Sequence, residues 1–415
     1  MATLLAPRRR LVASVITTTT HVKPTGPARQ STWTSSRSFH IPSKPPPPPN
    51  FAFAFDIDGV LLRGSTPLPG ASRSLRYLQD NGIPFILLTN GGGKTEAQRV
   101  SDLSRHLNVP IDVDMFVQSH TPFKQLVNGD EGFPRLKDEC ILVLGGQGNE
   151  CRDVAEGYGF TQVLTPADII TAYPALWPLA NHSLYTAHAR PILHKLGRPL
   201  RIAAILVFHD PRDWALDIQI VTDLLLSENG VLGTVSPQNG NPTLPNDGWQ
   251  QDGQPTVYFS NPDVVWASEY HMDRLGQGAF LQALAGTFNA IAGRRTKPGG
   301  FERILFGKPT AKTFVFAERK LEAHRQTLLA SSGGEEKTRP SKLENVYMIG
   351  DNPASDILGA NKHQSPSGTT WPSILVKTGV FKSGMPEYVP NAMVPDVTAA
   401  VSWALKESGW KKPFP

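Results

Sequence analysis

The chain has 415 residues, 40% of them hydrophobic and 19% charged, which is ample for a large buried core. Its net charge of +5 comes from the first 55 residues, which hold seven Lys/Arg and no acid, and leaves 34 basic against 36 acidic residues elsewhere. That balance gives no footprint for nucleic acid, no apolar run approaches the roughly 18 residues of a membrane span, and Cys140 and Cys151 cannot make a disulfide framework.

The N-terminal segment, residues 1–50, predicts a mitochondrial transit peptide followed by a Pro-rich linker. It is rich in Arg, Ser and Thr and free of acids, and Arg37-Ser38-Phe39-His40 looks like a cleavage site of a matrix protease. The prolines at 45–49 predict a stiff spacer. A plain disordered tail is the alternative, and in both interpretations the fold begins near Phe51.

From there, short apolar strands alternate with helical stretches, which predicts a mostly parallel α/β sheet. Helices are expected after the second strand, at 277–292 and at 310–323. The expected strands, in chain order, are 51–55, 83–90, 114–119, 140–145, 202–208, 256–261, 304–309, 345–351 and 373–379.

Polar residues follow four of these strands at their carboxyl ends. Each group taken alone also fits an ordinary turn or helix entry. In open parallel sheets, ligands bind beyond the carboxyl ends of the strands, so the four groups can form one site if their strands are neighbours. The four polar groups are Asp56-x-Asp58-Gly59, Thr89-Asn90-Gly91, Lys308-Pro309 and Gly350-Asp351-Asn352-x-x-x-Asp356.

These groups resemble the four motifs of the haloacid dehalogenase (HAD) superfamily. The matching segments are FDIDGVL (55–61), LTN (88–90), GKP (307–309) and IGDNPASD (349–356). The resemblance covers about residues 51–385. It implies an α/β fold, with a Rossmann-like parallel-sheet HAD core and an inserted α/β C2 cap domain.

The resemblance implies catalytic roles for four residues. Asp56 would be the nucleophile that forms an aspartyl-phosphate. Asp58 would protonate the leaving oxygen and later deprotonate the attacking water. Lys308 would neutralise developing charge, and Thr89 would hold the phosphoryl group.

It also implies a Mg²⁺ site, because this hard cation prefers oxygen ligands. The ligands would be the Asp56 carboxylate, the Asp58 carbonyl and Asp351, while Asn352 and Asp356 would support them. A second acid at position 58 favours phosphoryl chemistry, since the true dehalogenases of the superfamily lack it.

The long spacing between the second and third motifs indicates an inserted domain. Thr89 and Lys308 are 219 positions apart, far more than a core connection needs. This predicts core residues 51–137, a C2 cap at 138–268 and core residues 269–415. The placement resembles the C2-capped class IIA, and the glycine run after LTN and the 276–280 stretch resemble the family of the mitochondrial HAD-like hydrolase domain-containing protein five.

In that class, residues of the cap recognise the leaving group of the substrate. Substrate contacts are therefore expected from Thr89, Asn90 and Gly91 in the core, and from Asn261 and Asp263 in the cap. The partner would be a small phosphorylated metabolite, and relatives of this class often form homodimers through their caps.

Three functions remain open from the sequence. The leading one is a Mg²⁺-dependent phosphatase of a small organic phosphate in the mitochondrial matrix. The alternatives are a catalytically silent binding protein with the same fold, and a phosphotransferase that passes the phosphoryl group to an acceptor other than water.

Overall fold

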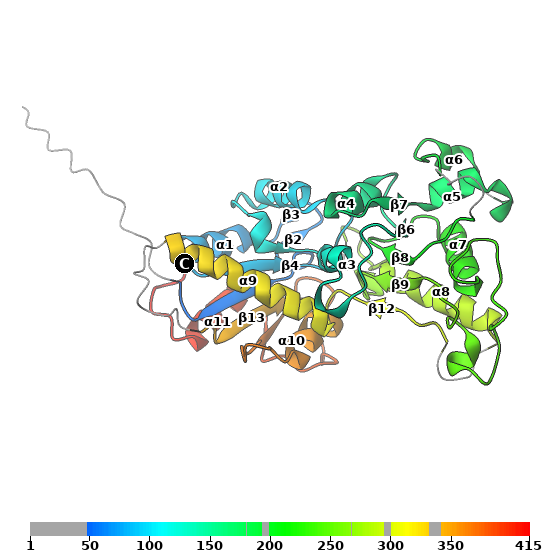
Figure 1. Cartoon of the computed structure of the whole chain (residues 1–415). Helices are drawn as coiled ribbons and strands as arrows, with labels where there is room; N and C mark the ends of the chain where they lie inside the picture. Colours follow the sequence, from blue (N-terminus) through cyan, green and yellow to red (C-terminus); the bar gives the residue numbers. More distant parts are fainter. Residues whose placement is uncertain (1–47, 180, 193–198, 267, 294–299, 332–341) are drawn as a thin grey trace, which may run out of the picture. The chain divides into compact units, whose positions relative to one another are not determined.

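The computed structural model describes residues 48–415, except 180, 193–198, 267, 294–299 and 332–341. The transit peptide predicted within residues 1–50 therefore lies almost wholly outside the described residues. The described residues form one compact unit, which contains two parallel sheets (Figure 1). No helix in the described ranges is both long and apolar enough to cross a membrane.

The core sheet has six parallel strands in the order β15-β14-β13-β1-β4-β5. Its central strand β1 is buried at every residue, because helices cover both faces and a continuous apolar run satisfies both. Its strands are β1 (Phe51–Phe55), β4 (Phe85–Leu88), β5 (Phe116–Val117), β13 (Asn345–Gly350), β14 (Ser373–Val376) and β15 (Ala392–Val394).

The two faces of β1 pack against different helices. Phe51, Phe53 and Phe55 join the cluster that contains apolar residues of α1 (Ala71–Asp80), α2 (Glu96–Leu107) and α11 (Val397–Glu407). Ala52 and Ala54 face the cluster that contains α9 (Ala311–Ser331) and α10 (Leu358–Lys362). The alternation of Phe and Ala therefore divides one strand between two layers of packing.

The cap sheet has five parallel strands in the order β12-β9-β8-β6-β7. One face packs on α5 (Pro166–Ala172), α7 (Trp214–Leu226) and α8 (Gln277–Ile291), and the other on α3 (Lys124–Asn128) and α4 (Glu150–Tyr158). The strands are β6 (Cys140–Leu144), β7 (Gln162–Leu164), β8 (Ala204–Val207), β9 (Thr256–Phe259) and β12 (Ile304–Leu305).

The boundaries of the cap differ from the predicted 138–268. Helix α8 packs Phe280, Leu284 and Phe288 into the cap core, and Ile304 of β12 pairs with Tyr258 of β9. The chain thus returns to the core sheet after β12 rather than at residue 269. Helix α3 likewise packs on the cap sheet, although it lies within the predicted first core segment. Apolar periodicity reports that a helix face is buried but not which sheet buries it.

Small elements lie beside the strand ends. The hairpin of β2 (Leu62–Arg63) and β3 (Thr66–Pro67) follows the first motif. The hairpin of β10 (Val265–Trp266) and β11 (Arg274–Leu275) follows β9. Helix α6 (Ser183–Thr186) lies in the cap, and the turn Pro353–Ile357 links β13 to α10.

Candidate active site

Three of the four motifs lie at the carboxyl ends of neighbouring core strands. Strand β1 pairs with β13 on one side and with β4 on the other, so Asp56, Asp351 and Thr89 leave the sheet side by side. The backbone N–H of Asp56 still donates to Ile349, at 2.9 Å. The predicted convergence of these three strand ends is therefore confirmed.

Lys308 reaches the same place by a different route. The sequence predicts a core strand at 304–309, but β12 belongs to the cap sheet, so Lys308 follows a cap strand. Its backbone is held on the core by Asn90, whose Oδ1 accepts from the Lys308 N–H at 2.7 Å and whose Nδ2 donates to the Lys308 carbonyl at 2.9 Å. A side chain of the second motif thus fixes the third.

The Lys308 ammonium joins two carboxylates inside the protein. With 1% of its side chain exposed, Nζ lies 2.6 Å from Asp56 Oδ1 and 2.7 Å from Asp356 Oδ1. Burial lowers the pKa of Lys308, but Asp356 and Asp56 outweigh it and raise the pKa above its ordinary value, so the ammonium stays charged. Burial raises the pKa of Asp56 to about 7, with Asp356 and Asp58 adding to the rise and Lys308 opposing it.

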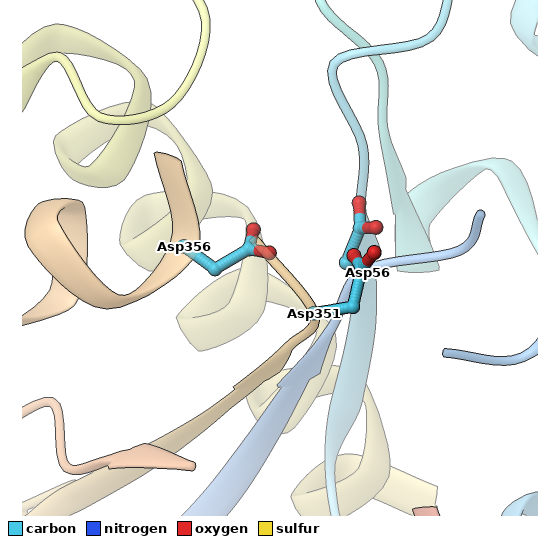
Figure 2. Close-up of side chains that lie close together, drawn as sticks. All are labelled: Asp56, Asp351 and Asp356. Carbon is cyan, nitrogen blue, oxygen red and sulfur yellow. The ribbon is translucent and has the colours of Figure 1, made fainter. Parts of the chain in front are cut away.

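Asp56, Asp351 and Asp356 form a cluster in which one carboxylate oxygen from each residue lies within 4.8 Å of the other two. Figure 2 shows Asp356 pointing from its helical turn toward the two strand-end acids. Both Asp356 oxygens are engaged, Oδ1 by Lys308 and Oδ2 by the Asn352 N–H at 3.0 Å. Asp351 accepts the Val380 N–H through Oδ2 at 2.6 Å, which leaves Oδ1 without a donor in the described chain.

The cluster contains three carboxyl groups, and Lys308 is the cation that contacts two of them, so the acids outnumber the lysine. Burial raises the pKa of Asp351 well above its usual range, and Asp56 and Asp356 raise it further. Gly59 lets the backbone pass close to the Asp351 carboxylate. A Cβ at this position would lie 2.6 Å from Asp351 Oδ2, and the φ of +89° also favours glycine. An all-oxygen donor set with excess negative charge fits a hard divalent cation such as Mg²⁺.

The second motif forms a tight loop over the site. Thr89 Oγ1 accepts the Gly91 N–H at 3.0 Å, and a Cβ on Gly91 would lie 3.7 Å from Asp58 Oδ2. At Gly92 a Cβ would lie 2.8 Å from both the His120 ring and Ser119 Oγ. The glycine run therefore lets the loop pass close to buried side chains that a larger residue would strike.

A buried chain of hydrogen bonds ties this loop to the cap. Gly93 N–H donates to His120 Nε2 at 3.2 Å, which places the ring proton on Nδ1, 2.8 Å from Tyr158 Oη. Tyr158 in turn donates to Glu96 Oε1 at 2.6 Å. Burial lowers the pKa of His120 to about 3, so the ring is neutral. Sequence reasoning missed these residues, because they are scattered over 93–158 without any motif spacing.

The cap loop after β9 docks on the second motif as well. Asp263 Oδ2 accepts from Asn90 Nδ2 at 2.8 Å, and the Asp263 N–H donates to Asn261 Oδ1 at 2.7 Å. Burial raises the pKa of Asp263 to about 6, although the Asn90 hydrogen bond and Lys308 oppose it. Contact of Asn261 and Asp263 with a substrate stays a prediction.

A cavity of about 350 Å³ unites these features. All eleven residues that the sequence predicts for the site line it, and so do residues that follow β8 in the cap. Its volume suits a small molecule. The predicted residues are Asp56, Asp58, Thr89, Asn90, Gly91, Asn261, Asp263, Lys308, Asp351, Asn352 and Asp356, and the further cap residues are His209, Asp210 and Arg212.

Comparison with known proteins agrees with this geometry. Residues 53–161 match the family described as haloacid dehalogenase-like hydrolase, and residues 305–400 match the one described as HAD-hydrolase-like. A mitochondrial hydrolase of Saccharomyces cerevisiae is 39% identical over 370 residues, which cover 86% of this chain and 96% of the relative.

Two further similarities extend the comparison. A Schizosaccharomyces pombe cardiolipin synthase (CMP-forming)/mitochondrial hydrolase fusion protein is 38% identical over 92% of this chain, which spans 57% of that relative. A solved structure, a hypothetical protein from Pyrococcus horikoshii, has a TM-score of 0.53 at 19% identity, covers 85% of this chain and 99% of its own, and concerns the fold alone.

The chain therefore belongs to the haloacid dehalogenase-like hydrolases. Its α/β cap is inserted between the second and third motifs, which is the arrangement of the C2-capped class IIA.

Proposed function

We propose that the protein is a Mg²⁺-dependent phosphatase that hydrolyses a small organic phosphate monoester in the mitochondrial matrix. The observation that carries this proposal is the position of Asp56. This carboxylate sits at the end of the central strand, contacts Lys308 at 2.6 Å and opens with Asp58 into a cavity of about 350 Å³. The size of the cavity favours a metabolite over a macromolecular substrate.

Two acids divide the chemistry. An oxygen of Asp56 attacks phosphorus and forms the aspartyl-phosphate, while Asp58 gives its proton to the departing alkoxide. A water molecule then attacks the phosphoenzyme, and Asp58 takes back a proton. Burial raises the pKa of Asp58, with Arg99 and Lys308 opposing the rise, which favours a proton on this group before the first step.

Surrounding groups would hold the phosphoryl oxygens. The Lys308 ammonium beside Asp56 offsets charge that develops on them. The loop N–H groups near Asn90 and Gly91 and the Thr89 hydroxyl would donate hydrogen bonds to them, on a loop whose backbone the Thr89 contact with Gly91 already orders.

The cluster described above fits Mg²⁺ in donor chemistry. Asp56, the Asp58 carbonyl and Asp351 would hold the ion, and Asn352 would act through the Asp356 carboxylate that it holds at 3.0 Å. When bound, Mg²⁺ would supply Lewis-acid stabilisation of charge on the phosphoryl group.

The mitochondrial location rests on two supports. Residues 1–50 have the composition of a transit peptide. The two fungal relatives also carry mitochondrial hydrolase in their names.

The test is hydrolysis of 4-nitrophenyl phosphate with Mg²⁺ and with EDTA. We expect Asp56→Asn to lower kcat/KM by roughly 10³-fold or more, because the attacking oxygen is lost. Asp138→Asn is the matched control, since this exposed acid pairs with Arg135 at the surface. Equal rates for wild type and Asp56→Asn would show that another group carries the reaction, and full activity in EDTA would refute the metal.

A further inference from the structure

Two arginines line the cavity without a carboxylate partner. Arg99 comes from α2 in the core and Arg212 from the segment between β8 and α7 in the cap. Among the described residues, no carboxylate lies within 4.0 Å of either guanidinium. In contrast, Lys308, which lines the same cavity, contacts two carboxylates.

His209 lines the same cavity as the two arginines. Its ring packs closely on Gly93 in the loop of the second motif. A Cβ added to Gly93 would lie only 2.5 Å from His209 Cδ2. Burial lowers the pKa of His209, Asp210 raises it, and Arg212 and Arg99 lower it further. Both guanidiniums therefore lie within electrostatic range of one neutral imidazole.

The surroundings of these arginines favour an external anion. Asp58 and Asp210 line the same cavity, yet neither forms an ion pair with Arg99 or Arg212 in the described part of the chain. A guanidinium that only balanced a structural acid would lie against it. Here the N–H donors of both groups stay available, and their planar fork matches a carboxylate or a phosphate.

Part of the cavity wall is apolar. Val265 and Trp266 of β10 also line the cavity, and 40% of the Trp266 surface is exposed. A short carbon skeleton can lie against such a wall while its two ends are held by charge. The cavity thus contains Lys308, which contacts Asp56 and Asp356, together with two arginines that have no carboxylate partner among the described residues.

We propose that the leaving group of the substrate carries a second acidic group, a carboxylate or a phosphate, which Arg99 and Arg212 bind. This inference rests on the proposed phosphatase function and specifies its substrate class. Asp210 limits the subsite, since its negative charge opposes the anion and weakens its binding.

Matched substrate pairs test the subsite directly. One pair is 3-phosphoglycerate and glycerol 3-phosphate, and the other is propane-1,3-diol bisphosphate and monophosphate. We expect wild-type kcat/KM to favour the acidic member of at least one pair by about tenfold or more. The pair that responds distinguishes a carboxylate from a phosphate.

Variants of the two arginines assign the preference to them. Arg99→Gln and Arg212→Gln should each reduce the ratio of acidic to neutral kcat/KM by roughly 10- to 100-fold, and Arg212→Lys by less, since a fork of donors is lost but the charge remains. The ratio comes from one preparation, so partial unfolding does not alter it. Arg105→Gln on the same helix and Arg201→Gln in the cap are controls, because both pair with surface acids.

An opposite change sharpens the test. Asp210→Asn should increase the same ratio, because it removes the local negative charge, and added salt should reduce the ratio in wild type. A wild-type preference for the neutral members, or arginine variants with unchanged ratios, would overturn the subsite while leaving the phosphatase intact. Failure of wild type to hydrolyse any phosphate monoester would overturn the proposed function and the subsite with it.

Discussion

The core sheet and the cap sheet are built alike but end in different chemistry. Both are parallel, with strands that are apolar on both faces. The core strands end in Asp56, Thr89 and Asp351, whereas β8 and β9 of the cap lead into His209 and Asn261. Since all five residues line one cavity, we propose that the core makes and breaks bonds and that the cap recognises the substrate.

Each region also buries a basic side chain that is paired with acid, and Lys308 of the core and Arg152 of the cap differ in what they face. In the core, Lys308 contacts Asp56 and Asp356 at the cavity. In the cap, Arg152 contacts Asp168 at 2.8 Å, with 1% and 0% of the side chains exposed, away from the cavity lining. If the division holds, breaking the first pair should cost activity and breaking the second should cost stability.

Among the variants that test this division between core and cap, Lys308→Met should have the largest effect. Loss of the ammonium removes the charge that offsets the developing phosphoryl anion, so kcat should fall by roughly 10²- to 10³-fold. Steady-state kinetics with 4-nitrophenyl phosphate measure this. Lys320→Met provides the control, because Lys320 pairs with the exposed Asp114. Activity near wild type would remove Lys308 from the chemistry.

Breaking the cap pair tests the other half of the comparison. Arg152→Met leaves Asp168 buried without its cation and also removes the hydrogen bond to Thr165 Oγ1, at 2.8 Å. The free energy of unfolding should fall by about 3–5 kcal/mol. Urea unfolding measures the loss, and kcat of the folded fraction should stay within about threefold of wild type. A selective loss of kcat with normal stability would contradict the division between core and cap.

The link between the regions should show an intermediate effect. Tyr158→Phe removes the hydroxyl that joins His120 Nδ1 to Glu96, which should cost about 1–3 kcal/mol. His120 also accepts the Gly93 N–H, so the loop of the second motif should lose its fixed position. As a result, kcat/KM should fall by roughly tenfold.

Tyr77→Phe is the matched control for this link. Its hydroxyl bonds Lys412 and Trp410 on the core, far in sequence from the loop, so its loss should lower stability without changing kinetics. If the two variants lose equal stability and neither changes kcat/KM, the hydrogen-bond chain is structural only.

The strand ends of the core were predictable because their signals are local. At Asp56 and at Asp351, the apolar run predicts a strand and the acid that ends the run predicts a functional group, all within a few residues. Family resemblance then related the segments to one another. The predicted fold class of a parallel HAD core with an inserted α/β cap is confirmed on this basis.

Contacts between distant segments were not predictable. Nothing near Asn90 indicates that its amide holds the backbone of Lys308, 218 positions away. The expected core strand at 304–309 was wrong for the same reason, since an apolar pair such as Ile304–Leu305 fits the edge of either sheet. Only tertiary packing decides between them.

The smallest expected effect concerns Asp263, where the cap meets the second motif. Its pKa rises from 3.8 to about 6 on folding, chiefly through burial, so the folded state binds the proton more tightly than the unfolded state. The contribution of Asp263 to the free energy of unfolding should therefore fall as pH rises from about 4 to about 6 and then stay constant.

Asp263→Asn removes that titration but keeps an oxygen that can accept from Asn90 Nδ2. The variant should match wild type near pH 4 and become more stable by about 1–2 kcal/mol above pH 6, less than the full shift because the site is only partly buried. Urea unfolding in EDTA between pH 4 and pH 8 measures the difference, with Asp138→Asn as a flat control. A difference that stays constant with pH would mean that Asp263 is ionised and paired in the fold, and the cap would then contribute a charge to the site as the core does.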